Sequence, residues 1–239
     1  MSPAFAGPGH GSLDVAYMIG ALPKLLPAFL VTIEVSAISL VLAMLFGLSG
    51  GTLRAYLANR NPAVWIMEGY VGIVRCTPII VQIYAAYLLL PKAGIRLDVF
   101  WIGVIALTFN SAGYQIEIAR AAIISVDEGQ SEAASALGLS RFRTALLVVL
   151  PQALRRMIPA ITNEMSHLVK ASAVLSVITL FELHKAANTL QDTSFKFAEL
   201  LALQALLYLP LILGVSRFAN HLEKNVFGIE GISSANDFR

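Results

Sequence analysis

Charged residues are scarce in this sequence, and it contains a single cysteine. Asp, Glu, Lys and Arg make up 13% of the 239 residues, about half the share typical of soluble domains. Hydrophobic residues make up 57%, and the mean hydropathy is +0.72, which together indicate an integral membrane protein. Cys76 alone excludes an internal disulfide, and a net charge of +2 is too small to predict nucleic-acid binding.

Motifs for catalysis are also missing. The phosphate-binding pattern G-x-x-x-x-G-K-[ST] does not occur, so any ATP must be bound by another chain. No nucleophile motif occurs, and the histidines lack the spacing of metal ligands; they are His10, His167, His184 and His221. We therefore expect no catalytic residue, no metal site and no cofactor in this chain.

Long hydrophobic runs dominate what is present. Five of them exceed the roughly 20 residues needed to cross a bilayer, at residues 22–48, 63–90, 99–124, 146–180 and 198–218. The expected fold class is an all-α integral membrane protein, with one transmembrane domain over residues 1–239. We expect a flexible lead and a short surface helix in residues 1–20, a polar helix and loop in 181–197, and a polar tail from 217. Pro78 interrupts the second run and predicts a kink, because proline removes a helix hydrogen bond.

Two of these runs carry polar side chains in their interiors. Asn110, Ser111, Tyr114 and Glu117 share one face of the third run, since they are spaced i, i+1, i+4 and i+7. The fourth run contains Asn163, Glu164 and Lys170. Polar residues within a membrane span face a cavity or a neighbouring helix rather than lipid.

The family resemblance given below implies an amino acid as the cargo, and such a set of groups could bind it. Its carboxylate needs a cation, for which Lys170 is the candidate, and its ammonium needs a carboxylate, for which Glu164 is the candidate. Glu117 lies nearer one end of its run and is a candidate exit or gate residue. Two alternatives stay open: Glu117 pairs with Arg120, and Glu164 pairs with His167 and Lys170 along its own helix.

The segment between the third and fourth runs, residues 125–151, is polar. We expect two short helices here, with a tight turn at Gly138 and with Ser140 capping the second helix. An exposed backbone turn is not stable in hydrocarbon, so this segment should lie at the membrane surface. A simple interfacial loop is the alternative.

The spacing within this segment resembles a known family pattern. Glu132-Ala133-Ala134, three residues, Gly138, nine residues and residues 148–151 (VVLP) resemble the EAA loop of bacterial ABC importer permeases. That pattern is E-A-A, three, G, nine, I-x-L-P, and only Val148 departs from it.

Other segments resemble the polar amino-acid group of these permeases, which carry histidine, arginine, glutamine or opines. Residues 75–82 (RCTPIIVQ) are similar to R-G-T-P-L-x-V-Q, with Cys76 in place of glycine and Ile79 in place of leucine. Residues 110–118 (NSAGYQIEI) are similar to N-S-A-A-Y-x-A-E-I. Ala171 and Ala173 depart from the family's K-D-T-S-L. The resemblance extends over residues 32–218.

The resemblance implies a permease subunit of an ATP-driven importer that moves a polar, basic amino acid by alternating access and is not itself catalytic. It implies as partners a second permease, identical or homologous, two ATP-binding subunits that hold ATP and Mg, a periplasmic binding protein, the amino-acid substrate and membrane lipid. An ion-coupled secondary transporter and a permease for methionine or another small polar solute are the alternatives.

The polar side chains within the runs and the resemblance together give candidate roles to residues. The substrate-binding residues would be Asn110, Ser111, Tyr114, Glu117, Asn163, Glu164 and Lys170. The residues that couple to the ATPase would be Glu132, Ala133, Ala134, Gly138, Leu150 and Pro151. The gate or kink would be formed by Arg75, Thr77, Pro78 and Gln82.

Basic residues predict the orientation, because Lys and Arg are enriched on the cytoplasmic side. An odd number of spans places the termini on opposite sides. Nine basic residues lie on the side of segment 125–151, and five lie on the other side. We therefore expect an inner-membrane protein with a periplasmic amino terminus, a cytoplasmic carboxyl terminus and a cytoplasmic EAA-like loop.

Overall fold

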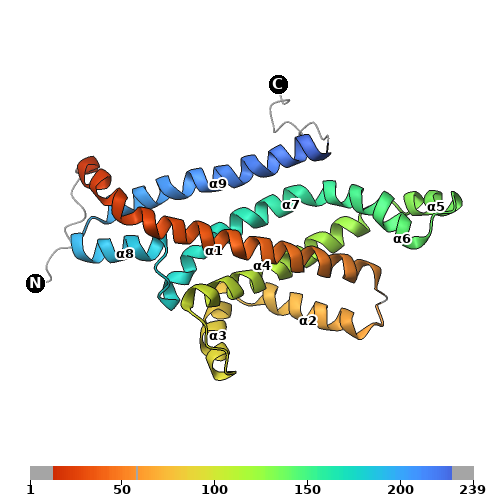
Figure 1. Ribbon diagram of the computed structural model, residues 1–239, viewed down its shortest axis with the longest axis horizontal. Helices are drawn as coiled ribbons and strands as arrows, with labels where there is room; N and C mark the ends of the chain where they lie inside the picture. The colour runs from red at the N-terminus through yellow and green to blue at the C-terminus, as the bar shows by residue number, and fades with distance from the viewer. Residues whose placement is uncertain (1–12, 58, 228–239) are drawn as a thin grey trace, which may run out of the picture.

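Every regular element is a helix in the part of the chain that the computed structural model describes, residues 13–57 and 59–227. Figure 1 shows the long helices running side by side, with α8 (Leu183–Ser194) at one end of the bundle and α5 (Glu128–Ala136) and α6 (Arg141–Thr144) at the other. Four stretches are each long and apolar enough to span a membrane: α1 (Val15–Tyr56), α4 (Val99–Ile124), the continuous stretch Arg141–Ile178, and the Phe197–Phe218 part of α9 (Phe197–Phe227). Helices α2 (Pro62–Cys76) and α3 (Ile79–Lys92) are a fifth candidate span if they are counted together.

Helix α1 (Val15–Tyr56) is longer than the expected run of residues 22–48. It begins at Asp14, whose side chain accepts a hydrogen bond from the Tyr17 N–H. The expectation of a separate surface helix before residue 20 is therefore wrong for residues 15–20, which form the first turns of α1. Residues 1–12 lie outside the described part of the chain.

The far end of α1 packs closely against α4 (Val99–Ile124). A Cβ atom at Gly47 would overlap the Gln115 side chain, and one at Gly51 would lie 2.6 Å from the Ala119 Cβ. The Gly-x-x-x-Gly spacing lets two membrane helices approach at the backbone. These glycines therefore continue the helix where their sequence alone would favour its end.

The second run is two helices, α2 (Pro62–Cys76) and α3 (Ile79–Lys92), which are bent by 114° relative to one another. Thr77 is extended, as is usual for the residue before a proline. The Gln82 Nε2 donates to the carbonyl oxygens of Val74 and Thr77, both at 3.0 Å, and so satisfies acceptors left free by the break. The kink expected at Pro78 is therefore confirmed.

The polar segment forms the expected pair of short helices, α5 (Glu128–Ala136) and α6 (Arg141–Thr144). Gly138 between them has a φ of 79°, and the Ser140 side chain accepts a hydrogen bond from the Arg143 N–H. Both local predictions are confirmed.

The fourth run is not one regular helix. A π-helical turn, Ala145–Val149, leads into α7 (Leu150–Ala171), and a 3₁₀ helix, Ser172–Ile178, follows. Within the π turn the Leu150 N–H bonds to the Ala145 carbonyl, five residues back. Pro151 lies in the first turn of α7 and has no N–H to donate. The π-helical hydrogen-bond pattern therefore ends at Leu150, and α7 continues from there.

The rest of the chain consists of α8 (Leu183–Ser194) and α9 (Phe197–Phe227). A helix in residues 181–197 is thereby confirmed. Helix α9 continues past residue 218, so the expected polar tail from residue 217 is helical as far as Phe227. The remaining residues, 228–239, lie outside the described part.

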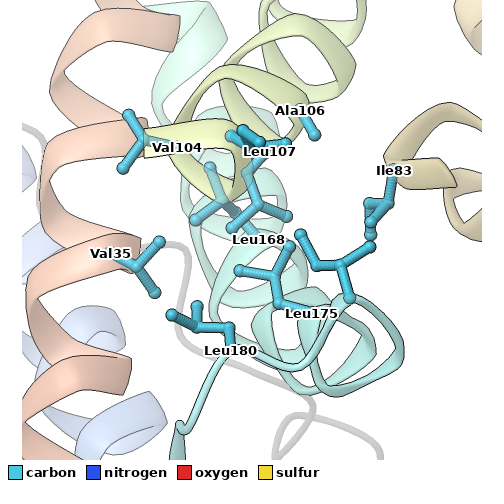
Figure 2. Close-up of a cluster of buried hydrophobic side chains, with 10 residues drawn as sticks. Val35, Ile83, Val104, Ala106, Leu107, Leu168, Leu175 and Leu180 are labelled. Atoms are coloured by element: carbon cyan, nitrogen blue, oxygen red, sulfur yellow. The ribbon is translucent and has the colours of Figure 1, made fainter. Parts of the chain in front are cut away.

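Buried apolar side chains connect these helices in three clusters. Figure 2 shows the middle cluster, where Val35 of α1, Val104 and Leu107 of α4, and Leu168 of α7 face one another. A second cluster joins α4 to α7, and a third joins α1 to α8 and α9. Helices α4 and α7, which carry the polar residues of interest, are therefore fixed relative to each other.

Candidate functional site

Ser111 of α4 and Glu164 of α7 meet between the two helices. The Ser111 Oγ donates a hydrogen bond of 2.8 Å to the Glu164 Oε1 and accepts one of 3.2 Å from the Gln115 Nε2. Ser111 and Gln115 are buried, whereas Glu164 is half-buried. The structure thus brings together residues from two runs that the sequence could only treat separately.

The other polar residues of α7 do not join this contact. Asn163, His167 and Lys170 are exposed in the described chain, and none of them pairs with Glu164. The alternative in which Glu164, His167 and Lys170 satisfy one another is therefore not what this chain shows. One oxygen of the Glu164 carboxylate, Oε2, has no hydrogen bond from the residues that the structure describes.

Asn110, although adjacent to Ser111, reaches a different helix. Its Nδ2 donates to the Gln82 Oε1 at 3.0 Å. The same Gln82 amide donates to the carbonyls at the α2–α3 break. Asn110 therefore holds the Gln82 side chain, which stabilises the break. The two adjacent residues of the expected polar face thus contact different helices, Asn110 contacting α3 and Ser111 contacting α7.

Glu117 pairs with Arg120 on its own helix, with 3.0 Å between the Arg120 Nε and the Glu117 Oε2. This confirms the alternative in which the two residues pair. Glu117 also lines two cavities, of about 650 and 470 Å³. Tyr114 shares the smaller one, and Arg75 lines both. Glu117 and Tyr114 therefore lie apart from the Ser111–Glu164 contact.

The residues expected to couple to an ATPase lie in and around α5 and at the start of α7. Glu132, Ala133 and Gly138 are exposed, whereas Ala134 is buried. A hollow of about 520 Å³ lies beside them, lined by Tyr56, Ser131, Glu132, Ser135, Arg141, Thr144, Ala145 and Val149. Leu150 is half-buried and Pro151 is exposed. Figure 1 shows α5 projecting from the end of the bundle, where another protein has access to it.

Three polar side chains that the structure makes prominent were not predicted from the sequence. Glu182 is fully buried, and its carboxylate accepts 2.8 Å hydrogen bonds from the N–H groups of His184 and Lys185. Burial raises the pKa of Glu182. Arg54 and Glu68 form an ion pair at the 650 Å³ cavity. In the sequence, the signal for the Arg54–Glu68 ion pair was the charge of Glu68 within an apolar run.

With this geometry in place, the comparison with known proteins decides the family. Residues 43–228 match the model of the binding-protein-dependent transport system inner membrane component. The chain belongs to this family. Recognition of an ABC importer permease and the expected all-α membrane fold are both confirmed.

Named relatives cover nearly the whole permease. It is 32% identical to the arginine transport system permease protein ArtQ of Bacillus subtilis (strain 168) over 216 residues, which cover 90% of this chain and 98% of that protein. It is 33% identical to the glutamine transport system permease protein GlnP of Escherichia coli (strain K12) over 211 residues, which cover 86% and 94%. A solved amino acid ABC transporter with histidines has a TM-score of 0.80 and 29% identity, covering 90% of this chain and 99% of that one.

Several broad expectations follow from family membership. Members are ABC permease subunits of the inner membrane, which are transporters and not catalysts themselves, and which work with ATPase and substrate-binding partners. The alternatives of an ion-coupled secondary transporter and of a permease for methionine or another solute are not favoured.

Proposed function

We propose that this permease moves a polar amino acid inward across the membrane and that the carboxylate of Glu164 binds the cargo's ammonium or basic side chain. The observation that carries the proposal is the contact between Ser111 and Glu164. Ser111 is twelve residues from the start of α4 and thirteen from its end, so the contact lies near the middle of a span. Relatives named for arginine and glutamine transport support an amino acid as cargo.

The residues around Glu164 have separate roles in binding the cargo, orienting Glu164 and gating. Lys170, in the last turn of α7, offers an ammonium for the cargo carboxylate, and Asn163 offers an amide beside Glu164. Ser111 orients Glu164 and leaves its second oxygen for the cargo. Asn110, through Gln82, sets the angle of the break at Arg75, Thr77 and Pro78, which gives that group its gating role. Tyr114 and Glu117 line the way toward the α5 end.

We assign the partners to the two ends of the bundle. Helix α5, with Glu132, Ala133, Ala134 and Gly138, docks on one of two ATP-binding subunits that hold ATP and Mg, and Leu150 and Pro151 begin the helix that transmits the movement. A second permease, identical or homologous, completes the pore, and a periplasmic binding protein delivers cargo at the α8 end. The amino terminus is periplasmic, and the carboxyl terminus is cytoplasmic.

Uptake by the complete importer tests the cargo site. We expect Glu164→Gln and Lys170→Met to assemble in normal yield but to lower uptake of labelled arginine by about tenfold or more, since a charge-assisted hydrogen bond contributes roughly 1.5–3 kcal/mol. Glutamine uptake should fall less in Glu164→Gln, because its side chain is uncharged. Lys92→Met, at the end of α3, is the matched control. Normal uptake at normal yield in both variants would remove these residues from the site.

A further inference from the structure

A second group of charges lies outside the Ser111–Glu164 contact, at the 650 Å³ cavity. The cavity opens between α1, α2 and α4, and its charged lining residues are Arg54, Glu68, Arg75, Glu117 and Arg120. Three arginines against two glutamates leave one excess positive charge. Arg75 and Glu117 also line the 470 Å³ cavity beside α7, together with Arg156. The two cavities therefore meet at these two side chains.

Most of the arginines here already have partners. Arg54 pairs with Glu68, Arg120 pairs with Glu117, and Arg156 donates to the backbone carbonyl and the hydroxyl of Ser125. Arg75 is different: it is exposed, and it has no hydrogen bond or ion pair with any residue that the structure describes. Its guanidinium is nonetheless close enough to interact electrostatically with the Glu117 carboxylate.

The place of Arg75 within a candidate span makes its lack of a partner informative. It lies in the last turn of α2, directly before the break in the candidate span that α2 and α3 form together. A charge within a span is costly unless it is paired or hydrated, and such residues mark the paths of substrates and ions. A guanidinium also presents a planar fork of donors that fits a carboxylate with two parallel hydrogen bonds.

We propose that Arg75 and Glu117 form a second binding site for the amino acid, between the Glu164 site and the α5 end of the bundle. Arg75 binds the α-carboxylate, and Glu117 accepts hydrogen bonds from the α-ammonium. This inference rests on the proposed function, because it takes the same cargo. A carboxylate has about four lone-pair positions, so Glu117 can accept the ammonium while it remains bonded to Arg120. Cavities of about 300–1,000 Å³ are of the size that holds small ligands.

The two sites use different side chains and lie on one path. Glu117 is six residues from Ser111 on α4, or about 9 Å along the helix. A cargo that leaves Glu164 thus meets a second pair of opposite charges before it reaches the α5 end. Every α-amino acid carries the groups that Arg75 and Glu117 recognise, so this site accepts the cargo's backbone and not its side chain.

Cys76 provides the reporter for a test, since it is the only cysteine of the chain, is exposed and lines the 650 Å³ cavity. The complete importer in nanodiscs, free of nucleotide, is treated with N-ethylmaleimide, and modification of the peptide that contains Cys76 is followed by mass spectrometry. We expect millimolar L-arginine and L-glutamine each to slow the modification several-fold. Agmatine, which is arginine without its carboxylate, should not slow it.

Variants separate this site from the one at Glu164. Each variant is compared with itself, with and without L-arginine, so that any change in the intrinsic reactivity of Cys76 cancels. Arg75→Gln and Glu117→Gln should lose the protection, whereas Glu164→Gln should keep it even though its uptake falls. Arg96→Gln, an exposed arginine in the α3–α4 loop, is the matched control and should keep it.

Several outcomes would overturn the second site. These are no protection by either amino acid, equal protection by agmatine, and protection that survives Arg75→Gln but is lost in Glu164→Gln. Equal protection by sn-glycerol 3-phosphate would assign the cavity to a lipid phosphate and would also overturn it. Unchanged uptake in Glu164→Gln with the protection intact would instead reject the proposed cargo site and leave this one standing.

Discussion

The buried carboxylate of Glu182 joins α8 to α9, and the residue after it bonds to α1. It caps α8 through the N–H groups of His184 and Lys185, and the Tyr208 hydroxyl of α9 donates to it at 3.4 Å. The neighbouring Leu183 N–H donates to the Thr32 Oγ1 of α1 at 3.1 Å. These contacts hold α8 against both long helices at this end of the bundle.

The protonation of Glu182 should make stability depend on pH. Burial raises its pKa in the folded protein, so the folded state holds the proton at pH values where the unfolded state, with a pKa of about 4.3, has lost it. The stabilisation is complete below the unfolded pKa and is lost as the pH rises through the folded one. We expect the Tm of the importer in nanodiscs to fall over this range, and Glu182→Gln, which does not ionise, to show a shallower fall. Glu128→Gln, exposed on α5, should behave as the parent does; an equally steep fall in Glu182→Gln would contradict the assignment.

At the scale of single residues, the sequence identified polar groups but not their partners. Ser111 and Glu164 were both candidates because a polar residue within an apolar run is unusual, yet 53 positions separate them. Asn110 and Ser111 are adjacent and turn toward different helices. Such pairings depend on how helices rotate and pack, which no local pattern encodes.

Elements were predicted well where local chemistry decides them. Pro78 has no N–H, Gly138 takes a positive φ, and Ser140 caps α6 with its side chain. Helix ends were predicted less well, because they depend on neighbours. Helix α1 continues through Gly50 and Gly51, which favour a helix end in isolation, because α4 packs against it there.

The contact between α1 and α4 should be sensitive to a single methyl group. Gly51→Ala would place a Cβ into the Ile116 carbonyl and 2.6 Å from the Ala119 Cβ, where backbone has to move. We expect a loss of about 1–3 kcal/mol, the usual cost of overpacking, measured as a lower Tm or yield of the complex. Gly20→Ala on the same helix meets nothing within 4 Å and serves as control. Equal stability of the two variants would show that the helices can separate without cost.

Gly138 tests the coupling role of the α5–α6 turn. Its φ of 79° resists any larger residue, but a side chain there would enter open space. We expect Gly138→Asp to leave the permease in the membrane and to weaken its binding to the ATPase subunit, so that cargo-stimulated ATP hydrolysis falls. Normal assembly with unchanged stimulation would reject the coupling role.

For the molecule as a whole, the two ends of the bundle differ in character. The α5 end carries exposed short helices and Arg141 and Arg143, while the α8 end carries Glu182 and the Lys196–Asp14 ion pair at 3.1 Å. Arg141 and Arg143 belong to the bias in Lys and Arg that predicts a cytoplasmic α5.

Cysteine labelling checks this orientation. With Cys76→Ser as background, Ser135→Cys on α5 should react with a membrane-impermeant maleimide in inside-out vesicles and not in intact cells. Thr193→Cys, exposed on α8, should show the reverse. Labelling of Ser135→Cys from outside the cell would show that α5 faces the outside and would contradict the predicted topology.

The break between α2 and α3 has a consequence for the order in which the protein is made. Each of the two helices is about 21–23 Å long, shorter than the hydrocarbon core of about 30 Å. Gln82, whose amide satisfies the carbonyls at the break, is itself held by Asn110 of α4. Because the ribosome makes Asn110 later than Gln82, the second span has to enter the membrane before its bend is secured. We therefore expect α2 and α3 to enter the membrane in a straighter form. They should reach their full bend of 114° only when α4 has been made and packs against them.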